Sequence, residues 1–89
     1  MGHARETAIH SSHPAVIKRL NRAKGHLARV IAMIESGEPC VDVAQQLYAV
    51  ERAILSAKRT FIHDHIDHCL TEARDASALD ELKALAKVL

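Results

Sequence analysis

The stretch from residue 40 to residue 72 contains no glycine and no proline, and this absence constrains the fold more than any other feature of the sequence. Its apolar residues recur at steps of three and four, which predicts one continuous amphipathic helix, unusually long for a globular domain. The residues that carry this pattern are Val43, Ala44, Leu47, Val50, Ile54, Ala57, Phe61 and Ile62.

A second amphipathic pattern precedes this stretch. Ser12 or His13 is expected to cap a helix that has Pro14 in its first turn and ends at Gly37. Its apolar positions are Val16, Leu20, Ala23, Leu27, Val30, Ile31 and Ile34.

A third helix is predicted from Ala78 to Leu89, with Ser77 as its cap. Its expected apolar face consists of Leu79, Leu82, Leu85 and Ala86.

Composition agrees with an all-α protein, because 48% of the 89 residues are hydrophobic while only Tyr48 and Phe61 are aromatic. Residues 1–12 are polar and aperiodic and are expected to form a mobile arm, whereas residues 13–89 are expected to form a single helical domain. A chain this short buries little surface alone, so we expect a homo-oligomer.

The sequence favours a cytoplasmic protein without a membrane partner. It has no apolar signal at its N-terminus and no run of roughly 18 apolar residues that could span a bilayer. In a reducing compartment, the two cysteines are expected to be thiols or metal ligands rather than a disulfide. The seven histidines favour metal binding further.

His65 and Cys69 are four residues apart, so a helix places them on one face, where they can share a metal ion. Cys40 could complete the site, but the helical rise puts it about 37 Å from His65. The three residues can meet only if the helix breaks or if two copies run antiparallel, with a two-fold axis near Ala53 and Ile54. His63 and His68 are expected at the surface, with His68 as a further candidate ligand.

Charge is distributed unevenly along the chain. Residues 14–36 carry five basic and one acidic side chain, whereas residues 37–72 carry three basic and six acidic ones. A positive edge that includes His26 is expected to contact duplex DNA, unless it is only a solvated helix face. No known DNA-reading motif is visible, so no base-specific contact is predicted. The basic residues concerned are Lys18, Arg19, Arg22 and Arg29, with Lys58 and Arg59 as an extension from the second helix.

Four segments strongly resemble the CsoR/RcnR family of bacterial metal-responsive repressors. They are SHP (residues 12–14), RLNRAKGHLARVIAMIESGEPC (19–40), AQQLYAVERAI (44–54) and HDHIDHCL (63–70). The resemblance implies a disc-shaped tetramer, a dimer of antiparallel dimers, that releases operator DNA when its inducer binds. It also implies that Cys40, His65 and Cys69 are ligands and that Arg19 and Arg59 contact DNA.

The resemblance leaves the metal open. Nickel and cobalt members recruit a histidine near the N-terminus, but the matching position here is Ala8, and His10 lies two residues away. Copper(I) members commonly have a tyrosine beside the first cysteine, where this chain has Pro39. Two thiolates and one imidazole suit trigonal Cu(I), which is the alternative, whereas the histidines near the N-terminus favour Ni(II) or Co(II), with His10 and His13 as added ligands. Zinc also fits such donors.

The sequence offers three alternatives to metal sensing. In a thiol switch of the same fold, Cys40 and Cys69 of neighbouring chains would respond to formaldehyde or persulfide. Metal storage or trafficking would need no DNA contact, which the positive edge argues against. Catalysis is disfavoured, because no nucleophile with an adjacent base and no cofactor loop is visible.

Overall fold

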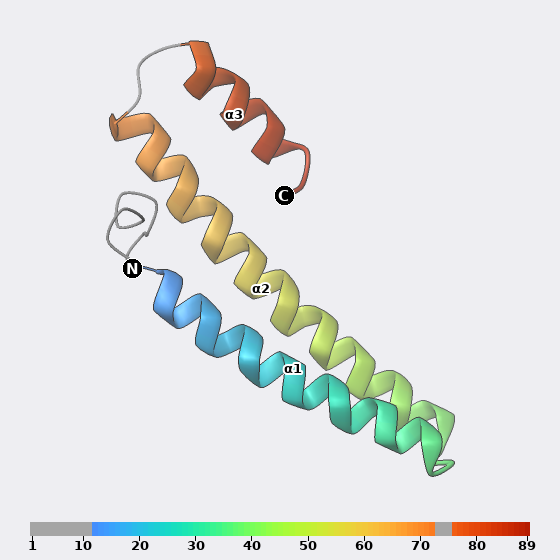
Figure 1. The fold of residues 1–89 in the computed structure, drawn as a ribbon. Helices are drawn as coiled ribbons and strands as arrows, with labels where there is room; N and C mark the ends of the chain where they lie inside the picture. Colours follow the sequence, from blue (N-terminus) through green and yellow to red (C-terminus); the bar gives the residue numbers. More distant parts are fainter. Residues whose placement is uncertain (1–11, 73–75) are drawn as a thin grey trace.

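The computed structural model describes residues 12–72 and 76–89, and these residues form three helices and no strand. Helix α1 spans His13–Glu35, α2 spans Cys40–Glu72 and α3 spans Ala76–Ala86. α1 and α2 form an antiparallel hairpin, and α3 folds back beside the second half of α2 (Figure 1). The predicted three-helix protomer with a long central helix is confirmed. The predicted arm lies outside the described residues, apart from Ser12.

The turn between α1 and α2 is set by Gly37, as predicted. Gly37 has a φ of +76°, a conformation that costs glycine little and other residues more. Its N–H donates to the carbonyl of Ile34 at 3.1 Å, and the N–H of Glu38 donates to the carbonyl of Met33 at 3.0 Å. These two bonds define a Schellman motif, which satisfies carbonyls left over at the end of α1.

The start of α1 differs from the prediction in one respect. Ser12 occupies the cap position and Pro14 lies in the first turn, but the Ser12 side chain makes no capping bond. Instead, its hydroxyl donates to Oδ2 of Asp64 on α2 at 2.7 Å. A carboxylate is a stronger acceptor than the alternatives available to this hydroxyl, so the contact between helices replaces the local cap.

Buried side chains recur at seven-residue steps on both long helices. This is the spacing of a coiled-coil seam, in which one row of side chains from each helix fills the interface. Alanine at two of the six positions lets the helix axes approach closely. Ile62 and Ala78 extend the core toward α3. The seam consists of Val16, Ala23 and Val30 on α1 and Val43, Val50 and Ala57 on α2.

α3 is rotated and shifted relative to the prediction. It begins at Ala76 and ends at Ala86, so Ser77 lies inside the helix rather than capping it. Ala78 is buried and Leu82 and Leu85 are half-buried, whereas Leu79 is 53% exposed. The face at positions 78, 82 and 85 meets α2, so Leu82 and Leu85 are buried in part as expected, whereas Leu79 and Ala86 are turned away.

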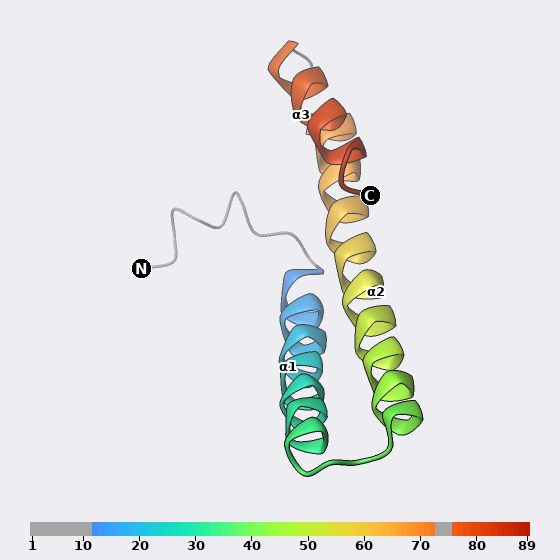
Figure 2. The same cartoon turned by 90° about the vertical axis from the view of Figure 1, so that its right-hand side faces the viewer.

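The protomer is a thin slab, and in the view of Figure 2 α3 overlaps the upper part of α2 while α1 stands beside α2. Its Cα positions extend over 54 × 31 × 14 Å, so the short dimension is about that of two packed helices. No helix among residues 12–72 and 76–89 is long and apolar enough to cross a membrane. A second seven-residue row of apolar side chains, 38–58% exposed, forms a surface that we call the apolar face: Leu20, Leu27, Ile34, Leu47, Ile54 and Phe61.

Candidate metal centre and nucleic-acid face

Cys40 is the first residue of α2, and its thiol is exposed. The turn brings this residue to the end of the hairpin, where it lines an open hollow on the apolar face. The rest of that hollow is formed by Ile34, Gly37, Glu38, Val43, Ala44 and Leu47. The thiol is therefore accessible to a ligand and stands at the edge of an apolar surface.

His65 lies near the other end of α2, and its side chain is 26% exposed. Its Nε2 is 3.0 Å from Oε2 of Glu81 on α3. Metal-binding histidines commonly donate their second ring N–H to a carboxylate, which fixes the tautomer and the ring orientation. The contact between His65 Nε2 and Glu81 is of this kind. The contact of Glu81 with His65 was not predicted from the sequence, because no local pattern reveals which α3 residue reaches α2.

The other predicted ligands are described only in part. Cys69 lies one turn beyond His65 on α2, but its side chain is outside the described residues. His10 is also outside them, whereas His13 begins α1 and stacks on Phe61. His63 and His68 are exposed, as predicted.

The structure does not bring Cys40 and His65 together within one chain. α2 runs unbroken between them, which separates the two residues by about 37 Å along the helix axis. Among the described residues, no group of three His, Cys, Asp or Glu side chains could hold a metal ion. The sequence left two ways for the three candidate ligands to meet, a broken helix or two antiparallel chains. Because α2 is continuous, the helix is not broken.

The hairpin presents two different surfaces. Hollows lined by Cys40 and by Phe61 open on the apolar face, and the helical phase of α2 places His65 on the same side. The opposite side carries a groove that we call the basic face, lined by Arg19, Arg22, Ala23, His26, Ala53 and Ser56. Candidate metal ligands and candidate DNA contacts thus occupy opposite sides of one thin slab.

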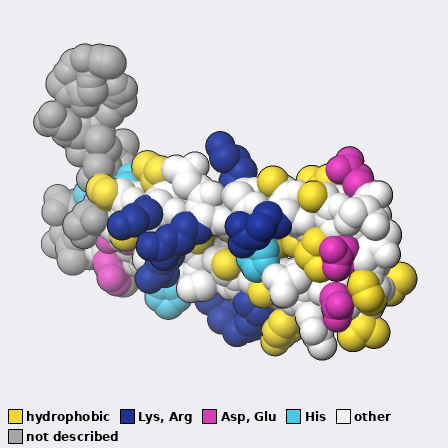
Figure 3. Space-filling view, turned by 90° about the horizontal axis from the view of Figure 1, so that it is seen from below, with side chains coloured by type: hydrophobic (Ala, Val, Ile, Leu, Met, Phe, Trp, Pro, Cys, Tyr) yellow, Lys and Arg dark blue, Asp and Glu magenta, His cyan; other side chains and the backbone are white. Residues whose placement is uncertain are grey.

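All five predicted DNA-binding residues are exposed. Figure 3 shows lysine and arginine side chains gathered around a histidine, with acidic and apolar side chains toward the right-hand end. Nη1 of Arg19 donates to Oγ1 of Thr60 at 3.4 Å, which links the two helices beside the groove. The expectation for Lys58 is wrong: it lines a hollow on the apolar face and donates to the carbonyl of Leu89 at 3.3 Å.

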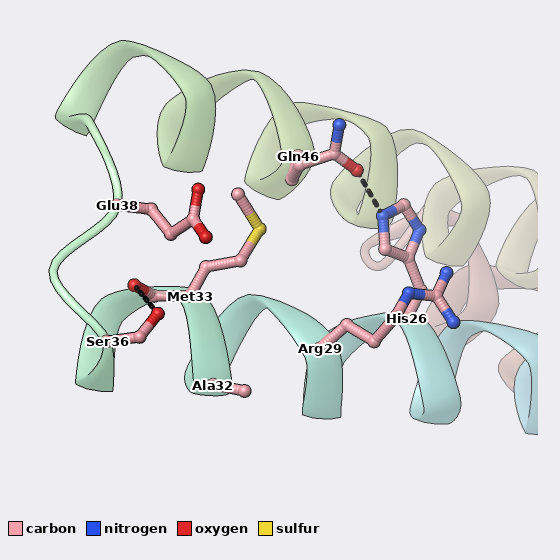
Figure 4. A pocket seen from close by; sticks show the side chains of 7 residues that line it. All are labelled: His26, Arg29, Ala32, Met33, Ser36, Glu38 and Gln46. Carbon is pink, nitrogen blue, oxygen red and sulfur yellow. Dashed lines mark hydrogen bonds between the residues drawn. The ribbon is translucent and has the colours of Figure 1, made fainter.

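A further hollow continues the basic face toward the turn. Figure 4 shows His26 reaching across to Gln46 of α2, with Arg29 beside it and Met33 and Glu38 at the far end. His26 Nε2 and Gln46 Oε1 are 2.7 Å apart, so this pair joins the helices in the middle of the basic face.

The sequence is similar to a family of transcriptional repressors and to several proteins named as such. The sequence profile of a family described as "Metal-sensitive transcriptional repressor" matches residues 12–89. The copper-sensing transcriptional repressor CsoR of Mycobacterium ulcerans is 42% identical over 72 residues, which cover 76% of this chain and 62% of that protein. CsoR of Mycobacterium tuberculosis is 35% identical over 72 residues, covering 76% of this chain and 60% of its own length.

A more distant relative is the copper-sensing repressor CsoR of Bacillus subtilis, with 31% identity over 58 residues that cover 65% of this chain and 57% of that protein. The chain spans about three fifths of the length of the curated relatives that it matches.

Proposed function

The chain belongs to the metal-sensitive transcriptional repressor family, and on that premise we propose that it binds operator DNA when metal-free and releases it when Cys40, His65 and Cys69 bind a metal ion. The separation of Cys40 from His65 along an unbroken helix carries this proposal. A site completed only between two chains makes metal binding depend on how the chains are arranged, and this dependence can be coupled to DNA affinity. The family is one of repressors, not of enzymes.

The apolar face supports an antiparallel dimer. Its six large side chains are between 38% and 58% exposed in one chain, and a second copy would remove them from water. A two-fold axis near Ile54 brings Cys40 of each copy toward His65 of the other and creates two equivalent sites. Pairs of such dimers would form the disc-shaped tetramer that the family resemblance implies.

The donor set fits copper(I) best. Two thiolates and one imidazole supply three soft or borderline ligands, and Glu81 already orients the imidazole. The relatives compared above are named copper-sensing, which supports the same ion. Ni(II) and Co(II), with His10 or His13 as further nitrogen ligands, stay the alternative, since they require the arm to join the site.

The basic face and its flanks supply the DNA contacts. Guanidinium and ammonium groups neutralise phosphates, so binding to double-stranded operator DNA would weaken strongly with salt. Such a role places the protein in the cytoplasm. The proposed contacts are Lys18, Arg19, Arg22, Arg29 and Arg59.

The function is tested by fluorescence anisotropy with a duplex selected from a random library by the metal-free protein. At constant salt and without oxygen, Cu(I) should weaken DNA binding at least about tenfold, which corresponds to about 1.4 kcal/mol of coupling. Cys40→Ala should abolish the effect. Tight metal binding without a change in DNA affinity contradicts the proposal. Release by formaldehyde in the presence of a chelator would instead favour the thiol switch.

The shared site is tested by mixing two inactive variants. Cys40→Ala and His65→Ala should each lose the site, because each removes one ligand from both copies of it. In a mixed antiparallel dimer, one site lacks both ligands and the other is intact. Random mixing should therefore restore about a quarter of the wild-type Cu(I) sites. No recovery after unfolding and refolding together would place the site within one chain.

A further inference from the structure

The start of α1 is attached to α2 directly beside His65. Ser12 donates to Oδ2 of Asp64 through its hydroxyl at 2.7 Å and through its backbone N–H at 3.4 Å. Ser12 and Asp64 are both half-buried. Because the Ser12 carbonyl accepts the first hydrogen bond of α1, from Val16 N–H at 2.9 Å, Asp64 fixes the position of the first turn.

An aromatic contact also joins the start of α1 to α2 near His65. The rings of His13 and Phe61 are stacked, with centroids 5.1 Å apart and planes 15° apart. Phe61 also contacts His65, one turn further along α2, at 5.9 Å and 32°. Phe61 therefore connects the first residue of α1 with the candidate metal ligand.

His65 is also held from α3, since Glu81 engages Nε2 at 3.0 Å. The ring is thus restrained by Phe61 on its own helix and by a carboxylate on another. It cannot tilt or shift without changing its contact with Phe61, and Phe61 cannot follow without changing its contact with His13.

We propose that Phe61 and Asp64 are positioning residues that transmit the state of His65 to the first turn of α1. This inference rests on the proposed function, because it describes how an occupied metal site alters DNA binding. α1 continues from that turn into Lys18, Arg19 and Arg22, and a helix moves these residues as a unit. Arg19 is additionally bound to Thr60, the residue next to Phe61.

The contact itself is tested in the metal-free protein by proton NMR of the imidazole C–H groups. A phenyl ring stacked on His13 shifts the His13 resonances upfield, so Phe61→Leu should remove that shift and also move the resonances of His65. Exposed His63 serves as an internal control and should not change. Unchanged His13 resonances would overturn the inference without any reference to metal.

The transmission is tested by measuring DNA affinity without and with Cu(I) in each variant; the ratio is the factor by which Cu(I) weakens DNA binding. Phe61→Leu and Ser12→Ala should each reduce this factor about tenfold, equivalent to about 1.4 kcal/mol of coupling. Helix content should stay at the wild-type level in both variants, Cu(I) affinity should stay at that level in Ser12→Ala, and His63→Ala should behave as wild type in every respect. Ser12→Ala changes no core side chain, so it provides a result even if the Phe61 variant folds poorly.

DNA release by the wild-type protein separates a failure of the proposed function from a failure of the transmission. If wild-type protein retains DNA in Cu(I) and in Ni(II), the proposed function is wrong, and the transmission is wrong with it. If wild type releases DNA and both variants release it equally well, only the roles of Phe61 and Asp64 are wrong.

Discussion

His65 illustrates how the chemistry of one residue depends on side chains distant in sequence. Glu81 reaches it from α3, and Phe61 contacts it from the preceding turn of α2. A free imidazole can present either nitrogen to a metal, whereas this one has Nε2 committed to a carboxylate. The contacts with Glu81 and Phe61 therefore set the orientation of the ring in the folded chain.

Glu81→Gln should weaken Cu(I) binding by about 10- to 100-fold, the usual effect of losing the carboxylate behind a ligand histidine. Affinity would be measured by competition with a Cu(I) chelator. Asp80→Asn, an exposed neighbour on α3, serves as the control and should leave affinity unchanged. Wild-type affinity in Glu81→Gln would mean that the contact with His65 has no role in the site.

Arg22→Gln should weaken DNA binding similarly for all sequences. It should also lower the slope of log K against log salt by about 0.9 for each subunit whose Arg22 contacts a phosphate. Lys24→Gln removes the same charge from the same helix but outside the basic face, so its slope should match wild type. Equal slopes for both variants would show that DNA binding follows net charge rather than this surface.

At the scale of elements, two glycines of similar exposure should respond oppositely to alanine. Gly37 has a φ of +76° and Gly25 lies within α1, and a Cβ at either would meet no atom within 4 Å. Gly37→Ala should destabilise the fold by about 1 kcal/mol through backbone strain alone. Gly25→Ala should stabilise it by about 0.5–1 kcal/mol. Urea unfolding followed by circular dichroism measures both, and the same sign for both would contradict this account.

The two long helices were predictable because their signals are local. The absence of Gly and Pro fixed the length of α2, and Gly37 with Pro39 marked the turn. Contacts between helices were not predictable in the same way. Ser12 bonds to Asp64 instead of capping α1, Lys58 turns toward Leu89, and α3 presents Ala78 rather than Leu79 to α2. Each of these outcomes depends on how neighbouring helices are rotated, which no local pattern encodes.

The sequence suggested the members of the candidate site, which stay a prediction, but it did not reveal their surroundings. Cys40 and His65 stand at the two ends of α2 as expected from the helical rise, and the dimer that would unite them stays a prediction. Glu81 and Phe61 complete the environment of His65 through tertiary contacts that the sequence does not display.

For the whole molecule, the thin slab divides its two proposed activities between opposite surfaces. The apolar face and the basic face are two sides of the same pair of helices, α1 and α2, because both helices contribute to the hollows on each side. A change in how two copies pack can therefore alter the spacing of arginine side chains on the far side. Under the proposed function, the oligomer would be required for metal sensing and not only for stability.

Ile54→Glu should disrupt the oligomer, because it places a charge near the proposed two-fold axis on the apolar face. Sedimentation should give a lower mass, and the Cu(I) site should be lost although every ligand is present. Ser56→Glu adds the same charge two residues away on the basic face and should keep the wild-type mass and Cu(I) affinity. Circular dichroism would establish that both variants stay helical. An Ile54→Glu protein of wild-type mass that still binds Cu(I) would show that the apolar face does not join the chains and that the metal site has another origin.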